Sequence, residues 1–291
     1  MNRLLYLLTA ACCLAVSCKS DPVPAAASAE NEPVQIVFSA VDAMSARVST
    51  KTDPITDPPA SFNTSATTGT TTETQVWNNE VFTASAGKYT GDKYWPLTET
   101  QFHFYASNAD LTFSDAGCSV VDVYANQTDV ICAYHETPTY KEENELAFKH
   151  IFARIGTVSI TPPAGYQVSS GLRIYINPYI KGTYNLKTRS WTGKAPDNSS
   201  PMKTIATATG NNANDLWLVP GTYTLTATYT LTKGSGGGSY SKNFTRTAIV
   251  TVVGGCINTI ETTLPQGTAE DIVFNVSVTP WDNHTVTASF S

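Results

Sequence analysis

Residues able to carry acid–base or metal chemistry are few and scattered in this chain. None of its 4 histidines pairs with a cysteine at the spacing of a zinc site. The patterns of a nucleophile elbow, of H-E-x-x-H and of a phosphate-binding loop are all missing from the sequence. Glu142 and Glu143 are adjacent, and nothing in the sequence places two carboxylates across a substrate. The sequence therefore predicts no catalytic residue, no metal and no cofactor, and the protein is not expected to be an enzyme.

Two of the histidines stand in segments whose structure can be anticipated. His103 alternates with Phe102 and Phe104, so we expect its imidazole on the solvent face of a strand. His150 follows an apolar stretch and is expected to be a packed or capping histidine rather than a general base.

The tryptophans are the other candidates for ligand contact. Trp191 lies in the polar stretch 188–193, which makes it the best candidate for an exposed aromatic that contacts a glycan. The alternative is that this indole fills a domain interface. Trp217 and Trp281 follow or flank apolar strand residues and are expected to pack in a core or at a sheet edge.

Composition narrows the class of protein. Charged residues make up 14% of the chain, against roughly 25% for an average globular domain, and there are 14 tyrosines. This composition favours strands over helices. The net charge of −6 excludes the basic surface of a nucleic-acid-binding protein, and the hydrophobic content of 41% excludes global disorder.

The N-terminal residues read as an export signal. Arg3 precedes an apolar stretch over residues 4–16 that is too short to span a bilayer. The stretch ends in Leu-Ala-Val-Ser-Cys, which resembles the L-x-x-C lipobox of bacterial lipoproteins. That resemblance implies a signal peptide over residues 1–17 and a diacylglycerol on the thiol of Cys18; an ordinary secretory signal is the alternative. Residues 18–33, rich in Pro, Ala and Ser, are expected to form a tether.

The remaining cysteines do not form a disulfide framework. Only Cys118, Cys132 and Cys256 follow the signal and Cys18. A hairpin turning at residues 126–128 would place Cys132 opposite residues 121–122, not opposite Cys118. Because a disulfide needs Cα atoms within about 7 Å, we expect buried free thiols.

Alternation of apolar and polar residues runs along the rest of the chain. Residues 222–232 read TYTLTATYTLT, which predicts a strand with one buried face, and residues 243–253 form its hairpin partner. Only residues 141–152 are compatible with a short helix. The pattern predicts an all-β protein with two tandem β-sandwich domains, over residues 34–145 and 146–291. Further strands are expected at 34–41, 101–107, 119–125, 130–135, 154–160, 172–180, 216–219, 258–263, 272–279 and 285–290.

Several sequence segments, taken in order, resemble the fimbrillins of type V pili. A strand at residues 34–41 is followed by Arg47 and a Ser/Thr-rich stretch. The other segments are KYWP at 93–96 before FHFYAS at 102–107, LAFKH at 146–150 with ARI at 153–155, and VSVTPW at 276–281.

This resemblance implies two sandwich domains of transthyretin-like, Greek-key topology and export to the outer membrane as a lipid-anchored surface protein. It also implies that an arginine-specific protease cuts at Arg47 and removes the first strand. A strand from another pilus subunit then fills the vacated groove, and the resulting fimbria supports adhesion to a glycan or protein on another surface. Not all members of the family are cut in this way, and Arg47 can equally be an ordinary solvated arginine.

The residues themselves give this model a physical basis. Val34, Ile36, Phe38 and Ala40 would all face inward, and a donor strand would restore both their contacts and the backbone ladder. Residues 285–290 carry Val286, Ala288 and Phe290 on one face and are a candidate donor, unless they complete their own sandwich. The alternative function is a surface lipoprotein that binds glycan and does not polymerise.

Overall fold

Strands form all the regular structure that the computed structural model describes. The chain divides into two units, Met1–Pro33 and Val34–Ser291, and nearly all described residues lie in the second. Within the described part no helix occurs. The described residues are 32–41, 59–111, 113, 118–122, 128–136, 138–169, 171–196, 202–208, 210–211, 216–233, 240–265 and 273–280.

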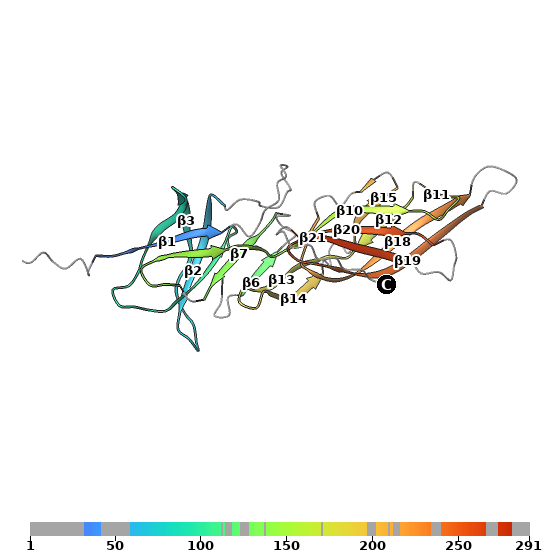
Figure 1. Ribbon diagram of the computed structural model, residues 1–291. Helices are drawn as coiled ribbons and strands as arrows, with labels where there is room; N and C mark the ends of the chain where they lie inside the picture. The colour runs from blue at the N-terminus through green and yellow to red at the C-terminus, as the bar shows by residue number, and fades with distance from the viewer. Residues whose placement is uncertain are drawn as a thin grey trace, which may run out of the picture. The chain divides into compact units, whose positions relative to one another are not determined.

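An eight-stranded sheet gathers the strands of the N-terminal part of the chain (Figure 1). All but one of the strands up to His150 belong to it. In hydrogen-bonding order they are β8 (Glu143–Ala147), β1 (Gln35–Val41), β4 (Lys88–Tyr94), β3 (Thr74–Ser85), β2 (Ser61–Thr68), β5 (Phe102–Ser107), β7 (Ile131–His135) and β9 (Lys149–His150).

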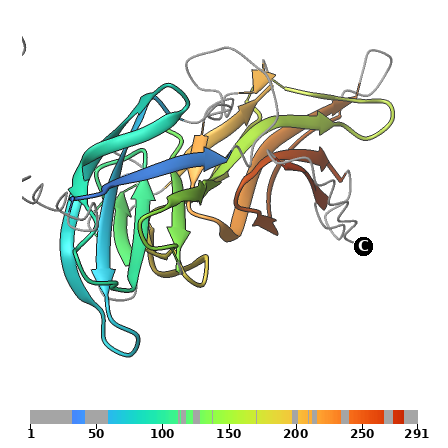
Figure 2. The ribbon, with the colours of Figure 1, turned by 60° about the vertical axis from the view of Figure 1, so that its left-hand side comes forward.

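This sheet curls around its own core. Strands β1 and β5 are four steps apart in the hydrogen-bonding order, which would separate them by about 19 Å in a flat sheet. The rings of Phe38 on β1 and Phe104 on β5 nevertheless have centroids 4.9 Å apart. The strands must therefore bend round until their inner faces meet, as Figure 2 shows with β1 in blue against the cyan and green strands.

The first strand agrees with the sequence prediction, whereas residues 141–152, whose sequence is compatible with a short helix, contain no helix. Ile36 and Phe38 are fully buried, and Val34 and Ala40 pack partly buried against the same core. Residues 143–150 form β8 and β9 instead of a helix. Burial alternates along β8, with Asn144 and Leu146 buried, so its apolar period is two residues rather than the 3.6 of a helix.

Two further sheets of the C-terminal part share one core. That core joins residues such as Ile155 and Ile260 of the smaller sheet with Ile174 and Leu225 of the larger one. The smaller sheet has the order β17 (Leu216–Leu218), β10 (Ala153–Thr161), β20 (Cys256–Thr263) and β21 (Val273–Pro280). The larger has the order β11 (Tyr166–Val168), β18 (Gly221–Lys233), β12 (Arg173–Ile176), β15 (Lys203–Thr207) and β16 (Gly210–Asn211), with β19 (Tyr240–Val252) paired to β18.

The predicted long hairpin is confirmed by β18 and β19, which pair antiparallel from Gly221 to Lys233 (Figure 1). Its core face carries the five predicted residues, all of them buried: Tyr223, Leu225, Ala227, Tyr229 and Leu231. Tyr223 donates a hydrogen bond from its phenol to the carbonyl of Val219, and Tyr229 donates one to Pro265. Each buried phenol therefore keeps a hydrogen-bond partner.

A three-stranded sheet corrects the prediction of a hairpin over residues 119–125 and 130–135. Strand β6 (Cys118–Asp122) pairs with β13 (Tyr179–Asn185), which in turn pairs with β14 (Ser190–Pro196). Strand β7 pairs instead with β5 and β9. The pairing of β6 with β13 spans about 60 residues of sequence, and local turn signals do not reveal such a contact.

The first sheet extends beyond the predicted domain boundary between residues 145 and 146. Strand β8 spans that boundary, and β9 still belongs to the first sheet. The division into two domains stays a prediction. A predicted single strand at 172–180 is divided between β12 and β13.

Candidate functional site

The first strand occupies an interior position of the first sheet. β1 pairs antiparallel with β4, with Val37 opposite Thr90, and parallel with β8, with Phe38 opposite Asn144. The N–H of Trp95 donates to the carbonyl of Val34 at 2.8 Å and extends the ladder by one bond. A strand held on both sides leaves two unpaired strand edges if it is removed.

Phe38 is the centre of the aromatic packing that holds β1 in place. Its ring lies edge-on to Phe82 with centroids 5.0 Å apart and edge-on to Phe104 at 4.9 Å, and it is tilted against Phe62 at 6.1 Å. These rings come from β3, β5 and β2, so one side chain of β1 contacts three other strands. Edge-to-face ring pairs contribute about 0.5–1.5 kcal/mol each beyond their buried area.

The outer face of β1 is bridged by polar groups of its two neighbours. Lys88 on β4 and Glu143 on β8 form an ion pair at 2.5 Å, so the pair joins the two strands on either side of β1. The hydrogen bond from Lys88 lowers the pKa of the Glu143 carboxyl, with a further hydrogen bond from Ser39 of β1. Gln35 adds a bond from its side-chain amide to the carbonyl of Gly91 at 2.7 Å.

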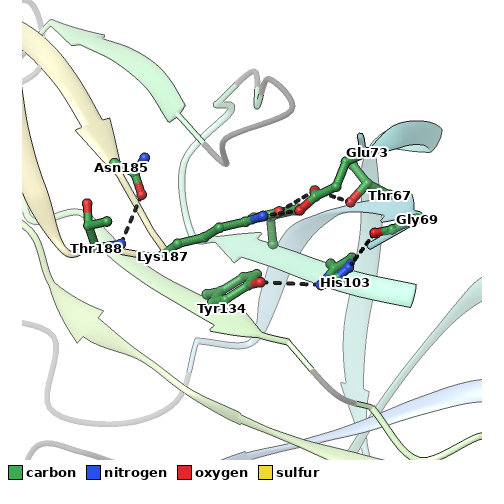
Figure 3. A network of polar contacts seen from close by, with 9 residues as sticks. Thr67, Gly69, Glu73, His103, Tyr134, Asn185, Lys187 and Thr188 are labelled. Atoms are coloured by element: carbon green, nitrogen blue, oxygen red, sulfur yellow. Dashed lines mark hydrogen bonds and ion pairs between the residues drawn. The ribbon is translucent and has the colours of Figure 1, made fainter. Parts of the chain in front are cut away.

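A buried polar network lies on the outer face of β5, where residues of the first sheet meet the turn after β13 (Figure 3). Glu73 accepts hydrogen bonds from Thr67 and, at 2.6 Å, from the phenol of Tyr105. The same carboxylate forms an ion pair with Lys187. The Lys187 ammonium also lies over the ring of Tyr134, 5.6 Å from its centroid.

Burial and the ion pair shift the pKa of the Glu73 carboxyl in opposite directions. Burial alone would raise the pKa of the Glu73 carboxyl, but the hydrogen bonds from Lys187, Thr67 and Tyr105 hold it below its usual value. Burial, and then the nearby Glu73, raise the pKa of the Tyr105 phenol. The pKa of Tyr134 is raised to about 12, chiefly by burial. The Glu73 carboxyl is therefore ionised and the phenols of Tyr105 and Tyr134 are neutral at neutral pH.

His103 belongs to this network, and its predicted place on a solvent face is wrong. Only 5% of it is exposed, and its Nε2 lies 2.9 Å from the carbonyl oxygen of Gly69. Its ring stacks on Tyr134, with the Tyr134 hydroxyl 3.3 Å from Nδ1 (Figure 3). His103 does alternate with Phe102 and Phe104, but a second layer of residues covers the face of the strand that the sequence predicts to be exposed to solvent.

His150 has the packed position expected of it. Its Nδ1 lies 2.7 Å from Oδ2 of Asp129, and both side chains are buried. Asp129 precedes β7 and His150 ends β9, so this contact joins two neighbouring strands of the first sheet.

Trp191 lies in strand β14 rather than in a loop, and its indole is half-buried. Its Nε1 donates to the carbonyl of Ile151 at 3.0 Å, and its ring stacks on Phe152 with centroids 5.7 Å apart. These contacts place it against a core cluster that also contains Tyr105, Leu186 and Trp217. The position favours the packing alternative over a glycan contact for this residue. Trp217 is buried as predicted.

Two cysteine side chains are described, and neither forms a disulfide. Cys132 and Cys256 are both buried, as predicted, and burial raises the pKa of Cys132 to about 12. Cys132 lies opposite Ser107 and Lys149, not opposite residues 121–122, because β7 pairs with β5 and β9. Four of the predictions fall outside the described residues: the predicted lipidation residue Cys18, the predicted cleavage residue Arg47, Trp281 and the candidate donor at residues 285–290.

Two other kinds of site are absent from the described residues. Among the described residues, no three His, Cys, Asp or Glu side chains lie together so as to hold a metal ion. No helix of that part of the chain is long and apolar enough to cross a bilayer. Sequence reasoning missed Glu73 and Lys187, which are 114 positions apart and carry no local motif.

A family model described as fimbrillin-like matches residues 44–281 of the chain. The protein therefore belongs to the fimbrillin-like family, which makes it a pilus-type subunit of the cell surface and not an enzyme. No curated protein sequence matches it.

Three solved structures are similar over most of their length. A cell adhesion candidate from Bacteroides ovatus has 12% identity and a TM-score of 0.47, and the match covers 86% of this chain and 98% of that one. A cell adhesion candidate from Bacteroides thetaiotaomicron has 11% identity and a TM-score of 0.34, with 82% and 96% covered. A fimbrial assembly protein from Parabacteroides distasonis has 7% identity and a TM-score of 0.35, with 85% and 96% covered.

Shortening Phe38 tests its place at the centre of the first core. Phe38→Ala should lower the free energy of unfolding by about 3–5 kcal/mol, because the truncation leaves a cavity among three rings. Chemical denaturation followed by tryptophan fluorescence measures the change. Ile249→Ala is the control, since 73% of Ile249 is exposed, and it should change stability by less than about 0.5 kcal/mol. A loss at Phe38 no larger than at Ile249 would show that β1 is not held by this ring.

Removing the cation of the polar network should have a pH-dependent cost. Lys187→Met should destabilise the protein by about 2 kcal/mol at pH 7, because Glu73 would be left as a buried carboxylate without its ion pair. The pKa of Glu73 is lower in the folded state, so the stabilisation is present above the unfolded value of 4.5 and is lost as pH falls through the folded value.

Denaturation of both proteins at pH 7 and pH 3 measures this effect. The difference between wild type and Lys187→Met should shrink at pH 3, and Glu73→Gln should restore part of the stability of Lys187→Met at pH 7. An equal difference at both pH values would contradict the assigned role of the carboxylate.

Proposed function

We propose that the protein is a pilus subunit that joins its neighbours by donor-strand exchange at the position of β1. The observation that carries this proposal is that β1 is an interior strand with two fully buried apolar side chains, Ile36 and Phe38. Arg47 lies between β1 and β2 in the sequence, so a single cut there separates β1 from every other strand.

The physical consequence of losing β1 is a groove that needs a new occupant. The rings of Phe62, Phe82 and Phe104 would lose their contacts with Phe38, and the facing edges of β4 and β8 would have unpaired backbone groups. A strand from another subunit satisfies both the ladder and the apolar pockets. Because such a contact is head-to-tail and does not close, it produces a filament.

The candidate donor is the segment 285–290 of another copy. A donor that runs in the direction of β1 would place Phe290 in the pocket of Phe38 and Ala288 in that of Ile36, since both pairs are two residues apart. Val286 would take the position of Val34. The C-terminal segment would then serve the neighbouring subunit rather than its own sheet.

Export is proposed to follow the lipoprotein route. The lipobox-like sequence before Cys18 supports acylation of its thiol, and the polar residues 18–33 would hold the folded part away from the outer membrane. The division into two sandwich domains, residues 34–145 and 146–291, belongs to the same proposal. Other pilus subunits would be the partners of the chain.

Cleavage at Arg47 is the direct test of polymerisation. Limited digestion with an arginine-specific protease should convert the purified protein into SDS-resistant ladders, whereas Arg47→Gln should remain a monomer. Phe290→Ala should reduce the ladders, because the Phe38 pocket would stay partly empty, and Thr287→Ala on the opposite face should not. Wild-type protein that is cut at Arg47 and stays a soluble monomer on size exclusion would rule out strand exchange.

The state of the N-terminus on the cell surface separates two stages of maturation. Sequencing of the surface form should give a start at Val48 for a processed subunit, and a blocked, lipid-bearing Cys18 for a retained anchor. Cys18→Ser should abolish incorporation of labelled palmitate, with Cys118→Ser as the matched control. Palmitate incorporation that persists in Cys18→Ser would disprove the lipidation assignment.

A further inference from the structure

Asn144, at the start of β8, closes the turn that leads into this strand. Its Oδ1 accepts a hydrogen bond from the N–H of Thr139 at 2.7 Å, and its Nδ2 donates to the carbonyls of Thr139 and Glu142 at 3.1 and 3.0 Å. Lys141 lies inside the turn with a φ of 60°, in the left-handed region. Because Asn144 is buried, water does not compete for these three bonds.

The same arrangement recurs at Asn258. Its Oδ1 accepts from the N–H of Val253 at 2.8 Å, and its Nδ2 donates to the carbonyls of Val253 and Cys256 at 3.0 and 3.1 Å. Gly255, with a φ of 66°, takes the place of Lys141. In both turns the asparagine contacts the residues five and two positions before it, with a left-handed residue three positions before it. We call this arrangement the asparagine bracket.

Each bracket is followed by a strand that runs parallel to the first strand of its part of the chain. Asn144 lies opposite Phe38 in the pairing of β8 with β1, and Asn258 lies opposite Ile155 in the pairing of β20 with β10. Both β1 and β10 pair antiparallel on their other side, with β4 and β17. The turn sequences TYKEEN and VGGCIN share only the asparagine, so the repeat is visible in the hydrogen bonds rather than in the sequence.

The strands beside the two brackets, β1 and β10, differ in whether the proposed function removes them. β10 is joined to the rest of the chain at both ends, so it stays in place. β1 is the strand that the proposed function removes, and β1 is the only strand with which β8 pairs among the described strands. Once β1 has left, no backbone ladder holds β8, and the bracket remains to fix the start of the strand.

Resting on the proposed function, we propose that Asn144 is a positioning residue for strand exchange. Its bracket keeps the start of β8 beside the vacated groove, so that the incoming strand meets a parallel edge that is already in place. When the edge of β8 is already ordered, binding of the donor does not include the free-energy cost of ordering it. Loss of this preformed edge should therefore slow association. Asn258 makes the same three bonds, and its Nδ2 also donates to the carbonyl of Arg154 on β10 at 3.3 Å. Because β10 never leaves, Asn258 is the control for the three bonds that both asparagines share.

The test measures uptake of a strand by the full chain. A specific protease site is placed within residues 42–50 and cut after folding, and Phe38→Leu in the chain's own β1 weakens its hold on the groove. A fluorescent peptide with the wild-type sequence of residues 34–41 is then added at several concentrations. The association rate constant is read from the concentration dependence, in otherwise wild-type protein and in Asn144→Ala and Asn258→Ala. Thermal unfolding of each protein measures the structural cost alone.

We expect Asn144→Ala to lower the association rate constant at least tenfold and Asn258→Ala to change it less than twofold, with similar losses in melting temperature. If Asn144→Ala does not fold, Asn144→Asp keeps the acceptor and removes both donors, and it should also slow association. If Asn144→Ala took up the peptide as fast as the protein that keeps both asparagines, the positioning role would be wrong, and strand exchange itself would still be supported. Failure of that chain to take up the peptide would overturn the proposed function, and this inference with it.

Discussion

The insertion of Phe38 between three strands is the contact on which the N-terminal part of the protein depends. The first sheet can curl because a large ring on β1 fills the space that the curl encloses, against Phe82 and Phe104. The same contact makes β1 essential to the core although it comes from a short segment at the start of the folded chain. A fimbrillin-like subunit that exchanges this strand must therefore receive a replacement of comparable size and shape.

Strand β5 connects the two sides of the first sheet. Phe104 faces the aromatic core and contacts Phe38, whereas its neighbour Tyr105 faces the other way and donates to Glu73. Through Glu73 and Lys187 the network reaches the turn between β13 and β14, and the core cluster around Trp217 adds apolar contacts there. The first sheet is thus covered on one face by its own strands and on the other by residues that follow much later in the sequence.

Sequence reasoning succeeded where alternation was local and failed where distant segments meet. The hairpin of β18 and β19 and the inward face of β1 could be predicted because their apolar period is two residues over many positions. Strand β2 was missed because its polar residues Thr64 and Ser65 are buried, so its sequence does not alternate between apolar and polar residues. Two errors share one cause: the wrong face predicted for His103 and the missed pair of Glu73 and Lys187. A second layer of residues covers the outer face of β5, and no local sequence pattern indicates this layer.

The place of β1 between two neighbours also determines how a strand there would respond to force. Ladder hydrogen bonds run across a strand, and here they lie on both of its sides, toward β4 and β8. In the proposed filament, tension would pull the donor strand along its own axis, so these bonds would be loaded together in shear instead of being broken one at a time. The ion pair between Lys88 and Glu143 joins the two flanking strands without using a charge of β1, so it would resist their separation whichever strand lies between them.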